Sequence, residues 1–253
     1  MKINDLKIKD YPRSLELFAE KFKKELGEKQ SAILSETANK FKECYKKGKS
    51  GKFSWEIEIS PKSRMFFPIH KSPGLPFDGY IDLTCKMKGQ ANFEDSVMKF
   101  EEYNVLIRVW STDKEISYRD EIDSPKIKDK LEKKGWCRII FSFRIERKNA
   151  SAKIPEPMYH LHFGSKEEKE ECYWFPDKFH VPRFCHFPMD LILLCEFIMA
   201  NFLPDETEDL RQKPEWKSFI VDSQQLCIKP YVEKMIESLS YDKNTFLQNL
   251  SNV

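Results

Sequence analysis

The hydrophobic period of this chain changes twice along its length. Apolar residues recur every three to four positions over residues 13–47 and again after residue 188, which predicts amphipathic helices at both ends. Between these segments, residues 53–59 alternate apolar and polar side chains without interruption, as a half-buried strand does. Helices, then strands, then helices indicate an α+β fold: a mainly antiparallel sheet of five to six strands, flanked by N-terminal and C-terminal helices.

Further strands are predicted where β-branched and aromatic residues gather. They cover residues 80–87, 103–110, 136–145, 158–163 and 171–175.

Glycine and proline mark where the other elements begin and end. Gly27 is expected to divide the N-terminal helical tract in two, and residues 124–135 predict a short exposed helix. Pro68, Pro73, Pro76 and Gly74 make residues 65–79 an expected irregular loop.

Toward the C-terminus, a helix is predicted from Pro188 to Phe202. Two more follow over residues 215–228 and 231–239, bent or separated at Pro230.

The chain shows no internal repeat and no low-complexity linker, so one α+β domain is predicted over residues 1–253. Within it, residues 1–50 are expected to be helical, residues 53–175 to form the sheet, and residues 188–245 to be helical again.

The composition bears on the cellular compartment and on the classes of partner. The seven cysteines form no CxxC pair, and no run of 18 apolar residues occurs, which predicts a cytoplasmic protein with reduced thiols and no membrane partner. A net charge of +2 does not indicate a nucleic-acid partner, although the aromatic and basic content permits one.

Four of the five histidines fall within 27 residues, at positions 160, 162, 180 and 186. Alternate residues of a strand point to one face, so His160 and His162 are expected to project together and to supply half of a metal site. The predicted metal ligands are His160, His162 and His180. His186, Cys172, Cys185 and Asp177 remain alternatives for a third ligand. The expected cofactor is therefore a divalent metal.

Arg183 precedes the predicted helix start at Pro188, where backbone N–H groups attract anions. The sequence thus predicts a binding surface of His160, His162, Arg183 and His186 for an anionic ligand or a protein partner. The alternative is that Asp190 caps the helix and Arg183 pairs with a local acid.

Two other chemistries stay open. Glu146-x-Lys148 after a strand is typical of a restriction-type nuclease core, in which Asp82, Asp120 or Asp123 would supply the second acid. A nucleophilic dyad would instead pair Cys172 or Cys185 with His160 or His162.

The stretch from residue 157 to 202 also resembles a known group. It includes Tyr159-His160-Leu161-His162-Phe163-Gly164, Pro182-Arg183 and Pro188-Met189-Asp190-Leu191. These motifs resemble uncharacterised prokaryotic proteins found near toxin–antitoxin or phage-defence genes. The resemblance implies a role beside a partner encoded nearby and assigns no catalytic residue.

The leading prediction is a recognition or assembly component of a prokaryotic stress or phage-defence system, acting with a protein partner or as a homo-oligomer. The alternative is a metal-dependent hydrolase, with a nuclease as the first class to test, that uses the His160/His162 cluster. The sequence does not decide whether the protein is an enzyme, and its catalytic residues are unknown.

Overall fold

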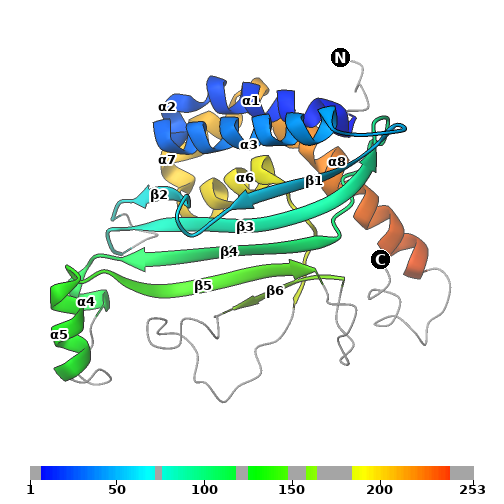
Figure 1. Ribbon diagram of the computed structural model, residues 1–253. Coiled ribbons are helices and arrows are strands. Elements are labelled where there is room, and N and C mark those ends of the chain that lie inside the picture. The colour runs from blue at the N-terminus through cyan, green and yellow to red at the C-terminus, as the bar shows by residue number, and fades with distance from the viewer. Residues whose placement is uncertain (1–6, 72–75, 118–124, 148–157, 164–183, 240–253) are drawn as a thin grey trace.

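The computed structural model describes residues 7–71, 76–117, 125–147, 158–163 and 184–239. Within these ranges, helices lie at both ends of the chain and most strands lie between them, so the predicted α+β order is confirmed (Figure 1). The helices are a short 3-10 turn η1 (Ile8–Asp10), α1 (Tyr11–Lys21), α2 (Lys23–Leu26), α3 (Glu28–Lys46), α4 (Lys114–Ser117), α5 (Pro125–Lys133), α6 (Leu191–Phe202), α7 (Pro204–Gln212) and α8 (Pro214–Leu239). The strands are β1 (Lys52–Ile59), β2 (Met65–Ile69), β3 (Gly79–Asn92), β4 (Glu102–Ser111), β5 (Arg138–Arg147), β6 (Tyr159–Phe163) and β7 (Phe184–Cys185).

The strands form one antiparallel sheet in the order β1-β3-β4-β5-β6-β7. Strand β3 is long enough to take two partners in succession. Its C-terminal part pairs with β1 and its N-terminal part pairs with β2.

Strand β2 corrects the prediction of an irregular loop over residues 65–79, because residues 65–69 are extended and paired. Pro68 sits within it opposite Tyr80. Proline is tolerated at this place because β2 pairs on one side only, so the missing N–H falls on the unpaired edge. The predicted strand over residues 171–175 lies outside the described residues.

The N-terminal helices pack on one face of the sheet. Gly27 has a φ of 90°, a left-handed conformation that glycine adopts readily, and it separates α2 from α3 as predicted. Phe41 of α3 stacks on Trp55 of β1, with ring centroids 5.6 Å apart. Trp55 faces Gly89 on β3, where an added Cβ would lie 2.6 Å from the indole ring, so this pair requires glycine.

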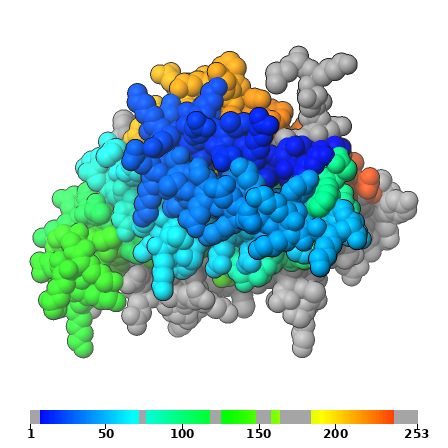
Figure 2. All heavy atoms as spheres, turned by 45° about the horizontal axis from the view of Figure 1, so that its top comes forward, coloured from blue at the N-terminus to red at the C-terminus, as the bar shows by residue number. Residues whose placement is uncertain are grey.

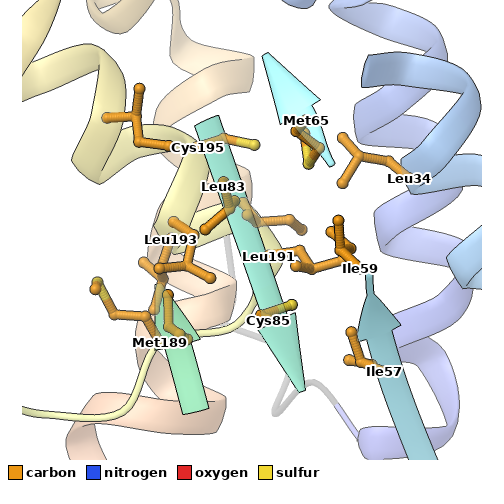
Figure 3. Close-up of a cluster of buried hydrophobic side chains, with 14 of the residues drawn as sticks. Leu34, Ile57, Ile59, Met65, Leu83, Cys85, Met189, Leu191, Leu193 and Cys195 are labelled. Atoms are coloured by element: carbon orange, nitrogen blue, oxygen red, sulfur yellow. The ribbon is translucent and has the colours of Figure 1, made fainter. Parts of the chain in front are cut away.

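The C-terminal helices pack against the same face. Residues of β1, β2 and β3 meet α3 on one side and α6 on the other, around side chains such as Ile59, Leu83 and Leu191 (Figure 3). On the surface, the N-terminal helices lie beside the C-terminal helices (Figure 2). None of the helices in the described ranges combines the length and apolar character that a membrane span needs.

Helix α6 begins where Asp190 caps it: one carboxylate oxygen accepts a hydrogen bond from Leu193 N at 2.9 Å. Helix α7 was not predicted. The two helices predicted on either side of Pro230 are one helix, α8. Pro230 lacks the N–H that would reach the Leu226 carbonyl, and Met98 N donates to that carbonyl instead, at 2.9 Å.

Candidate functional site

The site is built on the antiparallel pair β5 and β6. In the register of this pair, Arg144 lies opposite His162 and Glu146 opposite His160. Alternate residues share a face, so these four side chains project from the side of the sheet opposite the helices, while Ile145 between them is fully buried in the core. The rings of His160 and His162 lie 5.7 Å apart, as their i, i+2 spacing predicts.

Glu146 completes a group of three potential ligands with His160 and His162. One atom from each of the three residues lies within 4.8 Å of the other two. Glu146 Oε2 is 2.8 Å from His162 Nε2 and 4.0 Å from His160 Nε2. We call these three residues the Glu-His-His group.

The Glu-His-His group is partly buried, and the guanidinium of Arg144 lies next to it. His160 is only 2% exposed, whereas Glu146 and His162 are partly open. Arg144 Nε lies 2.9 Å from Glu146 Oε1. Burial acts to raise the pKa of Glu146, but the hydrogen bond from His162 and the charges of Arg144 and both histidines outweigh it. The pKa of this carboxyl is therefore lowered, and the carboxylate is ionised at neutral pH.

The contacts of His162 Nε2 favour one assignment of the ring proton. His162 Nε2 is 2.8 Å from a Glu146 oxygen and 3.1 Å from Arg144 Nε, but it cannot donate to one and accept from the other in a single tautomer. The shorter contact faces an ionised carboxylate, which only accepts, so we assign the proton to Nε2. A metal ion bound between these atoms would take the place of this proton.

This set of donors suits a divalent metal. Two imidazoles and one carboxylate form a common protein ligand set for zinc and for non-haem iron, and three ligands leave coordination positions for water or substrate. The ligands come from two hydrogen-bonded strands, so the backbone ladder fixes their spacing. The Glu-His-His group could therefore hold a metal.

The other residues of the predicted site do not gather here, or lie outside the description. His180 and Arg183 are outside the described residues, as are Cys172 and Asp177. His186 is described and lies on the opposite face, where its ring meets Phe197 of α6 at 6.2 Å and its Nδ1 contacts the Phe187 carbonyl oxygen at 2.7 Å. Burial lowers the pKa of His186.

The alternatives to a metal site find less support among the described residues. Cys185 lies opposite His160 in the pairing of β6 with β7, and its Sγ lies 3.6 Å from the hydroxyl of Tyr231, so the dyad with a histidine stays a prediction. Asp82 is fully buried, and it accepts hydrogen bonds from Arg64, Arg108 and Trp110. Its negative charge is thus already balanced by the two arginines. Asp120, Asp123 and Lys148 lie outside the description.

Glu146 is the ligand that the sequence did not connect to the histidines. It was singled out only as the first residue of Glu146-x-Lys148. The available signal was the order of two adjacent strands: if residues 138–147 pair antiparallel with residues 159–163, the end of the first strand meets the start of the second.

Comparison with known proteins adds no relative, because no family model, no curated protein and no solved structure matches this chain. The protein is therefore defined by its α+β fold and by the Glu-His-His group on the sheet face opposite the helices.

Proposed function

We propose that this protein is a metal-dependent hydrolase whose metal is held by Glu146, His160 and His162. The observation that carries the proposal is the convergence of three ligand atoms of suitable chemistry within 4.8 Å. When bound, such a metal lowers the pKa of a coordinated water and polarises the bond to be cleaved.

Arg144 has a positioning role in this proposal. Its guanidinium already contacts Glu146 Oε1, which leaves Oε2 directed toward the histidines. Groups that orient a ligand in this way typically change metal affinity by 10–100-fold when they are removed.

The Glu-His-His group supports a metal-dependent hydrolase in general, and it does not favour a nuclease over other hydrolases. On the same sheet face, Lys86 pairs with Glu102 and Lys88 with Glu56, so these cations are not a surplus that would attract a polyanion. A recognition or assembly role in a stress or phage-defence system rests on the sequence resemblance alone, because Arg183 lies outside the described residues.

Metal binding is tested first, on protein purified without a histidine tag. Elemental analysis and titration with Co²⁺, whose visible absorption reports its ligands, should give one metal per chain. The double variant His160→Ala/His162→Ala and the single variant Glu146→Gln should lose this metal. The matched control is His186→Ala, because His186 lies on the other face and should leave binding unchanged.

Hydrolysis is tested on chromogenic carboxylic and phosphate esters, with and without a chelator. We expect a chelator-sensitive rate that Zn²⁺ or Mn²⁺ restores and that Glu146→Gln abolishes. Because His160 is buried, thermal unfolding of each variant must show that the fold survives, and the partly open His162→Gln serves as a milder substitute. A wild-type protein without stoichiometric metal, or equal loss in His186→Ala, would overturn the proposal.

A further inference from the structure

A cavity of about 450 Å³ lies on the opposite side of the β5–β6 pair from the Glu-His-His group. Its wall includes Arg147 and Tyr159, which face each other across the two strands. This pair is the immediate neighbour of the pair Glu146–His160 and points to the other face. The volume is within the range of small-molecule sites.

Arg147 is held in place at this wall. Its Nη1 donates to the Glu101 carbonyl oxygen at 2.8 Å. An arginine side chain has five N–H donors in a rigid plane, so this bond orients the guanidinium and leaves further donors for a ligand.

Three lysines add to the positive charge of the cavity. Lys52, Lys99 and Lys234 line it, all are exposed, and none lies within ion-pair distance of a carboxylate in the described part of the chain. The two acids of the lining balance this charge only in part. Asp95 is engaged by the backbone N and the side-chain amide of Asn92, and Glu101 is exposed.

Apart from the amide side chains of Gln90 and Asn92, the rest of the lining is apolar or aromatic. Phe100 and Tyr159 are buried side chains at the base, and Tyr231 of α8 packs against Tyr159 with ring centroids 5.3 Å apart. A ligand that suits this cavity therefore carries an acidic group and a flat apolar body.

We propose that this cavity binds a small organic anion, with its acidic group at Arg147 and its apolar body against the aromatic residues. The site is separate from the Glu-His-His group and does not depend on a metal.

The test uses two fluorescent probes that share one aromatic body. 8-Anilinonaphthalene-1-sulfonate carries a negative charge, and N-phenyl-1-naphthylamine does not. In the presence of a chelator, we expect one molecule of the anionic probe to bind per chain, and the neutral probe to bind at least roughly tenfold more weakly, as the loss of a charge-assisted hydrogen bond implies.

Variants locate the binding. Arg147→Gln should weaken the anionic probe by roughly tenfold, on the same reasoning. Lys234→Glu should weaken it too, and it tests the charge without touching the folded interior, because Lys234 is exposed. Lys62→Glu makes the same charge change at an exposed position outside the cavity and should have no effect.

Three results would overturn the proposal: no binding of the anionic probe, equal binding of the neutral one, or equal weakening in Lys62→Glu and Lys234→Glu. Because a chelator is present throughout, these outcomes are independent of whether the protein binds a metal.

Discussion

Asp190 carries a charge that the surrounding protein disfavours. It caps α6 through one oxygen, while its other oxygen is buried without a hydrogen-bond partner in the described structure. Burial raises the pKa of Asp190 from 3.8 to about 6. Its titratable neighbours Tyr11, Cys195 and Cys227 have pKa values that burial also raises, so they stay neutral in mildly acidic solution.

The sign of the resulting pH effect follows from proton linkage. Between about pH 4 and pH 6 the folded protein keeps a proton that the unfolded chain releases, so the free energy of unfolding falls as the pH rises through this window. A shift of this size corresponds to roughly 3 kcal/mol.

Asp190→Asn should remove this dependence while keeping a competent helix cap. We expect the stability of the variant relative to the wild type to increase from pH 4 to pH 7, by up to roughly 3 kcal/mol. Urea unfolding at a series of pH values measures it. A difference that stays constant with pH would contradict the assignment.

At the scale of elements, Pro230 explains how α8 is docked. A proline inside a helix frees the carbonyl four residues earlier, and here Met98, from the connection between β3 and β4, takes it. The helix therefore gains a hydrogen bond to the sheet layer at the place where it loses one of its own.

Pro230→Ala restores the N–H that competes for the Leu226 carbonyl. We expect the Met98 amide to exchange its hydrogen faster, by roughly tenfold, which is the size of effect that one weakened hydrogen bond implies. Hydrogen–deuterium exchange measures it. Pro214→Ala is the control, because Pro214 begins α8, where an N–H has no helical partner, and exchange at Met98 should not change.

The elements that the sequence predicted well are those with a strong local period. Residues 53–59 alternate cleanly, residues 103–110 are rich in β-branched and aromatic side chains, and both are strands; Gly27 interrupts the N-terminal helices as expected. Strand β2 was missed because Pro68 is a turn signal locally, and only its place at a sheet edge makes it acceptable.

One part of the candidate site could be predicted from the sequence and the rest could not. The shared face of His160 and His162 follows from a period of two residues within one strand. Glu146 depends on the pairing between two strands, and the side of His186 depends on its packing against Phe197. Long-range pairing and packing are not encoded in local spacing.

At the scale of the whole molecule, the two ends of the chain form one aromatic cluster. Phe18 and Phe22, from the N-terminal helices, meet Trp216 of α8 with ring centroids 5.0 and 4.9 Å apart, and both also meet Phe219. We therefore propose that the helices of both ends and the sheet unfold as one cooperative unit.

Phe18→Ala should lower the free energy of unfolding by about 3–5 kcal/mol, because it leaves a cavity in this cluster. Circular dichroism and tryptophan fluorescence should still report one shared transition. Leu17→Ala removes an exposed side chain from the same helix and should change stability by less than about 0.5 kcal/mol. Two separate transitions in the wild type would show instead that the ends fold independently.

Successive residue pairs of β5 and β6 point to opposite faces of the sheet. Glu146–His160 and Arg147–Tyr159 are successive rungs of one ladder, yet they open to opposite sides of the sheet. On the two proposals made above, a metal on one side and an anion on the other would be separated by a single peptide layer. If binding on one side changes the affinity on the other, thermodynamic reciprocity makes the factor identical in both directions.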